Sequence, residues 1–147
     1  MKVVIQVVDE ASVTINNEVF NEIDNGYLLL VGIDQNDDEN TLTKMAAKIA
    51  NLRINADENG KTNLSILQTK GKILSISQFT LCASLESRRP SFCKAAKPDI
   101  AKYYYELFNK KLREYDIVVK EGIFGEDMIV SLKNHGPFTI VLTEKDI

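Results

Sequence analysis

Two short polar stretches of this chain hold the residue types that could carry chemistry. The first is Ser77-Gln78-Phe79-Thr80-Leu81, and the second is Asn134-His135-Gly136-Pro137-Phe138-Thr139. Each places small polar groups at the end of an apolar run, a position where a rigid scaffold commonly presents functional residues. Groups of this kind can act on an already activated substrate through hydrogen bonds alone, because preorganised donors stabilise a developing oxyanion.

The hydroxyl of Thr80 allows three interpretations. It is a nucleophile if a base takes its proton, but the neighbouring sequence offers no evident base. It can instead donate hydrogen bonds together with its backbone amide, which is the interpretation we favour. It can also simply end a strand, since threonine is common in strands.

The Gly136-Pro137 pair predicts an unusual backbone in the second stretch. Proline offers no N–H to a sheet and is confined to edges, bulges and turns, while glycine allows a close backbone approach. An X-Pro bond also adopts the cis form at a cost of only about 0.5 to 1 kcal/mol. The two carbonyls of this pair could therefore point to the same side.

The absence of certain residue types and motifs excludes several catalytic mechanisms. His135 is the only histidine, and no His, Cys and carboxylate residues share ligand spacing, so we expect no metal site and no cofactor. A serine triad would need a carboxylate beside His135, and none is near in sequence. No GxxxxGK[ST] phosphate loop occurs. Cys82 and Cys93 are expected to be free thiols.

Composition predicts one globular domain over residues 1–147. Hydrophobic residues make up 44% and charged residues 27% of the chain, which leaves little room for long disordered segments. No apolar run reaches the length of a membrane span, and the first residues have a strand pattern in place of a signal peptide. We therefore expect a cytoplasmic protein that does not bind membranes.

Charge is distributed unevenly along the chain. The net charge is −3, yet residues 88–113 contain eight basic and two acidic residues. A basic patch of this kind suits contact with a phosphate backbone. A solvated helix face is the competing interpretation, because charge runs usually have that role.

The order of apolar patterns predicts an α+β fold, with a curved or barrel-like, mostly antiparallel sheet and two packed helices. Residues 27–33 should form a strand that is buried on both faces, and Asn16-Asn17 should form a hairpin turn. Further strands are expected at residues 3–7, 13–15, 19–23, 73–76, 117–119, 128–132 and 138–142, the last two joined by a short loop.

Helical spacing predicts two helices. The first begins near Asn36, whose distance to Glu39 suits a capping box, and the second begins at Pro98. The predicted buried stripes are Leu42, Met45, Ala46, Ile49 and Ala50 in the first helix, and Ile100, Tyr104, Leu107, Phe108 and Leu112 in the second.

The two polar stretches, taken with other segments, resemble the D-aminoacyl-tRNA deacylases. The resemblance runs nearly from end to end, and its blocks occur in one order. These blocks are Ala11-Ser12-Val13-Thr14, Asn51-Leu52-Arg53-Ile54, Glu58 to Lys61 with Asn63-Leu64-Ser65, Ser77 to Leu81, Arg88-Arg89-Pro90-Ser91-Phe92, Gly122-Ile123-Phe124-Gly125 and Asn134 to Thr139.

The resemblance implies hydrolysis of the ester bond of D-aminoacyl-tRNA, and also of mischarged glycyl-tRNA. It assigns catalysis to Ser77, Gln78, Phe79 and Thr80, with the N–H groups around Phe79 and Thr80 and the Gln78 side chain holding the oxyanion. The 2′-hydroxyl of the terminal adenosine would help to position water. It assigns tRNA binding to Arg88, Arg89, Lys94 and Lys97.

In this family the Gly-Pro pair of one subunit enters the active site of the other. The resemblance therefore implies a homodimer that binds the 3′ end of aminoacylated tRNA, and not DNA. Asn134, Gly136, Pro137 and Phe138 would bind the substrate, and the Gly136 and Pro137 carbonyls would leave no space for an L side chain.

Three positions depart from the family pattern. Val7 stands where an arginine usually helps to hold the Gly-Pro segment, Phe138 replaces a valine, and Thr62 replaces a methionine. These departures leave open a chirality-relaxed deacylase, which in a related branch has a trans Gly-Pro bond. A non-catalytic tRNA-binding module and a structural or interaction protein are the further alternatives.

Overall fold

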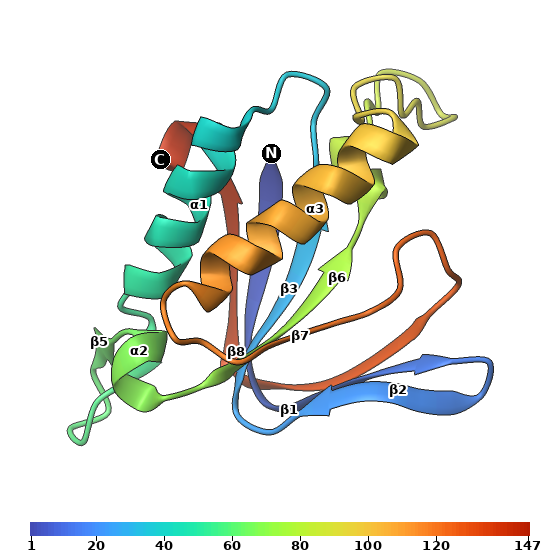
Figure 1. The fold of residues 1–147 in the computed structure, drawn as a ribbon. Coiled ribbons are helices and arrows are strands. Elements are labelled where there is room, and N and C mark those ends of the chain that lie inside the picture. The colour runs from blue at the N-terminus through green and yellow to red at the C-terminus, as the bar shows by residue number, and fades with distance from the viewer.

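A six-stranded mixed sheet organises the computed structural model, which describes residues 1–147 (Figure 1). Strand β1 (Lys2–Ile15) pairs antiparallel with β2 (Glu18–Ile23) and β3 (Gly26–Gly32) along one edge and with β8 (Ile129–Thr143) along the other. Strand β6 (Lys72–Ser77) is parallel to β3, and β7 (Val119–Glu121) is parallel to β6. The predicted α+β fold with a curved sheet is confirmed.

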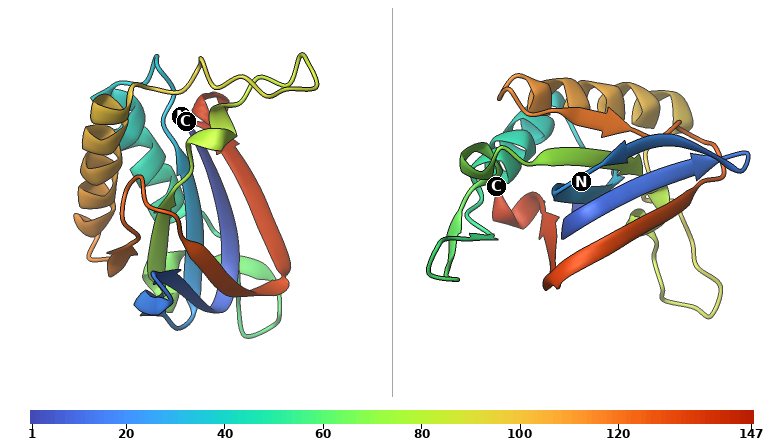
Figure 2. Two further views of the ribbon diagram at one scale, coloured as in Figure 1. Left: turned by 90° about the vertical axis from the view of Figure 1, so that its right-hand side faces the viewer. Right: turned by 90° about the horizontal axis from the view of Figure 1, so that it is seen from below.

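The sheet is strongly curved (Figure 2). Two separate clusters of buried side chains pack on its two faces. The larger cluster lies beneath helices α1 (Glu39–Asn51) and α3 (Pro98–Arg113) and includes Tyr27 and Leu29 of β3. The smaller cluster includes Val13 of β1 and Leu28 of β3. Strand β3 is therefore buried on both faces, as its continuous apolar run predicted.

Helix α1 buries the five predicted residues Leu42, Met45, Ala46, Ile49 and Ala50. The predicted cap was wrong, however. Asp38 caps the helix, and its carboxylate accepts a hydrogen bond from the Thr41 N–H at 2.7 Å. Asn36 belongs instead to the preceding turn, where its N–H donates to the Asp34 carboxylate. Asn and Asp cap equally well, so only the path of the chain selects between them.

Helix α3 begins at Pro98 as predicted. At most positions of its buried stripe, however, the buried residue lies one position after the predicted one. The buried residues are Ala101, Tyr105, Phe108, Asn109 and Leu112, whereas Ile100 is 49% exposed and Tyr104 and Leu107 are half-buried. Consecutive aromatic residues along this helix fit several stripes equally well. The small side chain of Ala101 belongs to the observed face, and our prediction passed over it.

The remaining elements are short. Strands β4 (Asn55–Ala56) and β5 (Thr62–Leu64) form a separate hairpin, and two 3-10 turns are η1 (Phe79–Cys82) and η2 (Glu144–Asp146). A third helix, α2 (Ile66–Thr69), was not predicted because it is a single turn, which Ser65 and Gln68 close with a reciprocal capping box. No helix has both the length and the apolar character that crossing a membrane requires.

Strand β8 corrects the prediction of two strands joined by a short loop. The Gly136-Pro137 pair lies inside one long strand, and its peptide bond is cis. In the pairing with β1, Gln6 lies opposite Thr139 and Val8 lies opposite Asn134. Residues 135–138 therefore face the single residue Val7, so the Gly-Pro segment bulges out of the ladder.

Candidate functional site

A cleft of about 690 Å³ opens beside the carboxyl end of β6. One wall consists of Ser77, Gln78 and Phe79, where β6 passes into η1. The second wall is the chain from Phe92 to Pro98 at the start of α3, and the third is the connection between β7 and β8 with Phe124, Glu126, Asp127 and Met128. The first predicted stretch thus forms one wall of a cleft.

The chain turns sharply at Gln78 because its backbone is bonded on both sides. Its N–H donates to the Val31 carbonyl at 2.7 Å, and its own carbonyl accepts the Leu81 N–H at 3.2 Å. Gly32 lets this turn lie against β3, since a Cβ there would be 2.9 Å from the Leu81 Cβ. The N–H groups of Phe79 and Thr80 lie at the first two positions of η1. No carbonyl within this turn can accept hydrogen bonds from them.

Thr80 has no base in contact with its hydroxyl. The Gln78 side-chain amide donates to the Thr80 hydroxyl at 2.6 Å, and this is the hydroxyl's only recorded hydrogen bond. Thr80 is exposed and follows the three cleft-lining residues at the rim. The structure therefore brings Ser77, Gln78, Phe79 and Thr80 together, with an amide as the partner of the hydroxyl.

The Gly-Pro segment lies at the other end of the sheet. His135, Gly136 and Phe138 line a separate hollow of about 380 Å³ together with Val7 and Gly26. Gly26 pairs with Lys72 at the start of β6, whereas Ser77 ends that strand. Five residues of strand span about 17 Å, so a single chain does not bring the two predicted stretches together.

Side-chain hydrogen bonds hold both ends of the Gly-Pro segment. The Asn134 carboxamide oxygen accepts the Phe138 N–H at 2.8 Å, and its amide donates to the Thr139 hydroxyl at 2.8 Å. Gln6 donates to the same hydroxyl at 3.3 Å. Asn134, which we predicted to bind substrate, therefore has its side chain engaged across the bulge.

Asp9 and His135 form a pair that the sequence analysis missed. Their side chains meet at 2.9 Å across β1 and β8, and both are exposed. Asp9 is far from His135 in sequence, so only the strand pairing brings it there. Val7, where an arginine was expected, has a half-buried apolar side chain that packs against the larger core cluster, as does Phe138.

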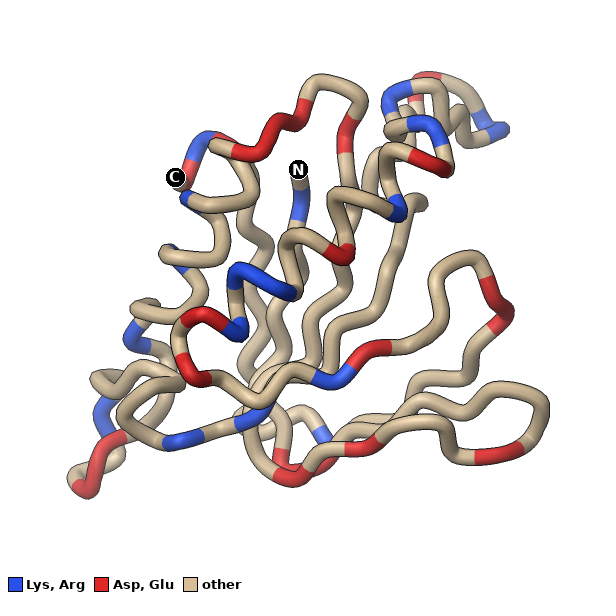
Figure 3. Tube along the Cα trace, in the orientation of Figure 1, with Lys and Arg blue, Asp and Glu red and all other residues tan.

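Seven of the eight basic residues in the segment 88–113 lie in two groups, and the eighth, Lys102, lies between them on α3. Arg88, Arg89, Lys94 and Lys97 are exposed on the chain before α3, and Lys97 lines the cleft. Lys110, Lys111 and Arg113 lie at the far end of α3, about 20 Å away along the helix axis. Arg113 is paired there with Glu121 at 2.9 Å. Blue segments accordingly appear at both ends of the helix in Figure 3.

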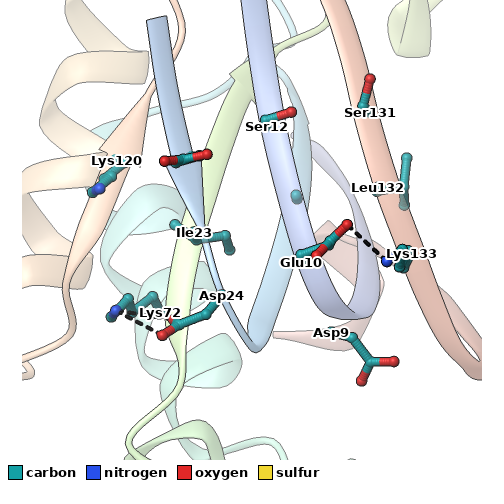
Figure 4. A pocket seen from close by; sticks show the side chains of 12 residues that line it. Asp9, Glu10, Ser12, Ile23, Asp24, Lys72, Lys120, Ser131, Leu132 and Lys133 are labelled. Atoms are coloured by element: carbon teal, nitrogen blue, oxygen red, sulfur yellow. Dashed lines mark hydrogen bonds and ion pairs between the residues drawn. The ribbon is translucent and has the colours of Figure 1, made fainter. Parts of the chain in front are cut away.

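A hollow of about 700 Å³ on the outer face of the sheet contains none of the predicted site residues (Figure 4). Its charged side chains largely neutralise one another, with Lys72 at 2.9 Å from Asp24 and Lys133 at 3.0 Å from Glu10. The hydrogen bond from Lys72 lowers the pKa of Asp24. No group of three or more His, Cys, Asp or Glu side chains is placed to hold a metal ion.

Comparison with known proteins identifies one family. Residues 4–143 match the family model described as D-Tyr-tRNA(Tyr) deacylase. A D-aminoacyl-tRNA deacylase of Lactobacillus gasseri is 53% identical over 143 residues, which cover 97% of this chain and 99% of the relative. A D-aminoacyl-tRNA deacylase of Bacillus pumilus is 50% identical over 147 residues, covering 99% of this chain and 100% of the relative.

Solved structures share the fold. The c-Myc DNA Unwinding Element Binding Protein superposes with a TM-score of 0.92 at 38% identity, covering 97% of this chain and 98% of that one. A probable eukaryotic D-amino acid tRNA deacylase superposes with a TM-score of 0.81 at 16% identity, covering 96% and 97%. The second likeness concerns the fold alone. With a family match over residues 4–143 and relatives at half identity along the whole chain, this protein belongs to the D-Tyr-tRNA(Tyr) deacylase family.

Proposed function

We propose that this protein hydrolyses the ester bond of D-aminoacyl-tRNA and releases the free D-amino acid and tRNA. The observation that carries the proposal is the cleft at the end of β6, where Ser77, Gln78 and Phe79 form a wall. Relatives with about half of their residues identical are named D-aminoacyl-tRNA deacylases. The terminal aminoacylated adenosine would occupy the cleft.

Hydrolysis would proceed by oxyanion stabilisation. Water adds to the ester carbonyl, and the N–H groups of Phe79 and Thr80 with the Gln78 amide hold the negative oxygen. The ester C–O bond then breaks, and the ribose oxygen leaves with the proton that water supplied. Each donor of this kind contributes about 3 to 4 kcal/mol to the transition state. The 2′-hydroxyl of the terminal adenosine would position the water, without metal or cofactor.

The Gly136-Pro137 segment would select the D configuration in the cleft of a second subunit. Two observations support this part of the proposal. The segment bulges out of the sheet with exposed Gly136 and Pro137, and it lies about 17 Å along β6 from the cleft of its own chain. A homodimer could therefore supply the segment to the cleft. Rejection at Cα by main-chain carbonyls would spare L esters but leave glycyl-tRNA open to cleavage.

The direct test is single-turnover deacylation of matched D- and L-tyrosyl-tRNA by the purified protein in the presence of a chelator. We expect loss of the D ester alone. Cleavage of both esters would identify the chirality-relaxed alternative, and cleavage of neither would favour a tRNA-binding module. Inhibition by the chelator would contradict the metal-independent mechanism.

Replacing Thr80 with valine is expected to leave the single-turnover rate on D-tyrosyl-tRNA within about tenfold of wild type. The variant keeps the backbone N–H and loses only the hydroxyl that Gln78 contacts. Thr80→Ser serves as the matched control because it keeps the hydroxyl. A nucleophilic Thr80 would instead show a loss of about 10⁴-fold or more in the valine variant, with activity retained in the serine variant.

A further inference from the structure

Two exposed phenylalanine rings meet at the rim of the cleft. Phe79 and Phe92 are 55% and 39% exposed, and their ring centroids lie 5.0 Å apart in a T-shaped arrangement. Phe79 belongs to η1, whereas Phe92 directly follows the projecting loop before α3. Contiguous exposed aromatic surface commonly marks a binding site. The wall of the cleft therefore continues outward as an aromatic surface.

Exposed basic residues precede and follow Phe92 in the chain. Arg88, Arg89, Lys94 and Lys97 are exposed, and none of the four has a recorded ion pair. Two backbone hydrogen bonds between Ser84 and Ser91, of 2.7 and 3.0 Å, close the base of the loop that carries both arginines. Figure 2 shows this loop projecting well beyond the sheet. The two arginines therefore extend the surface away from the cleft, whereas Lys97 lines it.

The opposite wall has the opposite charge. Glu126 and Asp127 line the cleft from the β7–β8 connection and are exposed. A phosphate chain would be attracted to the loop that bears Arg88 and Arg89 and repelled by these carboxylates. The charges thus define one side from which a polyanion can enter.

We propose that Phe79 and Phe92 form a stacking platform for the unpaired nucleotides that precede the terminal adenosine of tRNA, with the four cations holding their phosphates. The inference rests on the proposed function, because it takes the cleft as the place of the aminoacyl-adenosine. Aromatic rings beside a basic track are the usual means of binding single strands without sequence preference, since every base has a π-face. A platform of this kind would serve tRNAs of different identity.

A second copy of the chain suits this surface less well. Covering the rings would take nearby cations out of water, and charged residues are depleted at the cores of protein interfaces. An RNA backbone supplies a phosphate for each of those cations instead. We therefore assign the surface to RNA, and the test below includes the second copy as an outcome.

The test compares one variant on two substrates. Phe92→Ala removes a ring without touching β6, and Phe20→Ala is the matched control, since Phe20 is 48% exposed on β2 outside the cleft. The substrates are D-tyrosyl-tRNA and D-tyrosyl-adenosine, which lacks the preceding nucleotides. Because Phe92 also lines the cleft, both substrates can lose activity in Phe92→Ala; we expect kcat/KM to fall about tenfold more on the tRNA than on D-tyrosyl-adenosine, as loss of one base stack predicts. Phe20→Ala should change neither.

Three results would overturn the platform. These are an equal loss on both substrates, no loss on the tRNA, and conversion of an oligomer to monomers by Phe92→Ala in sedimentation, which would assign the rings to a second copy. Circular dichroism confirms that the variants are folded.

A binding measurement distinguishes failure of the stacking platform from failure of the deacylase proposal. Fluorescence anisotropy with a labelled RNA tetranucleotide ACCA should show about tenfold weaker binding by Phe92→Ala. Replacing Arg88 and Arg89 with glutamine should lower the slope of log affinity against log salt by about 0.7 for each lost phosphate contact, whereas Phe92→Ala should leave it unchanged. If the wild-type protein binds ACCA in this way but cleaves neither substrate, the platform stands and the deacylase proposal fails. If ACCA does not bind, the platform is wrong.

Discussion

Gly136→Ala is expected to slow single-turnover deacylation of D-tyrosyl-tRNA by at least about 100-fold, the loss that a misplacement of 1 Å can cause. Gly136 has a φ of +115°, which L side chains rarely adopt, and an added Cβ would lie 3.0 Å from the Phe138 backbone nitrogen. The backbone must therefore shift, and the carbonyls of Gly136 and Pro137 shift with it. Because Gly136 is exposed at a bulge, the variant should still fold.

Gly60→Ala is the matched control for this experiment. Gly60 also has a positive φ, of +72°, but nothing lies within 4 Å of its added Cβ. It belongs to the turn between β4 and β5 and lines neither the cleft nor the Gly-Pro hollow. Full activity of Gly136→Ala would show that the segment has no part in deacylation. Equal losses in both variants would point to a general effect of backbone strain.

The free energy of unfolding is expected to fall steeply between pH 10 and pH 12. Burial raises the pKa of Tyr27 and of Tyr105 to about 12, and both side chains are almost inaccessible to solvent. The unfolded chain releases these protons near pH 10, before the folded protein does, so stability is fully present below pH 10 and is lost above it. Each of the two tyrosines lowers the free energy of unfolding by about 1.4 kcal/mol for each pH unit. The total loss approaches about 5 kcal/mol at pH 12.

Urea unfolding at intervals from pH 8 to pH 11.5 measures this loss. Tyr27→Phe and Tyr105→Phe should each remove about half of the slope. The Tyr105 variant also loses the 2.8 Å hydrogen bond to the Ser75 carbonyl, but that carbonyl keeps the Gly122 N–H as a donor. A flat profile in the wild-type protein would contradict the high pKa values.

Local elements of the fold were predictable where one physical signal acted alone. The stripe of α1 was correct because its small and apolar residues fit one face only. Asn16 and Asn17 both adopt positive φ, of 51° and 65°, as a tight hairpin of asparagines predicts. The cap of α1 and the stripe of α3 were wrong because chemically similar residues competed there. The choice between them depends on neighbours distant in sequence.

The sequence by itself determined the local elements and the two polar stretches, because residue type and spacing decide these within a few positions. The tertiary structure alone decided where they lie. It runs β8 through the Gly-Pro pair as one strand, since pairing with β1 continues on both sides of the bulge. It also separates the two stretches by the length of β6, because sheet register joins residues that are far apart in the chain.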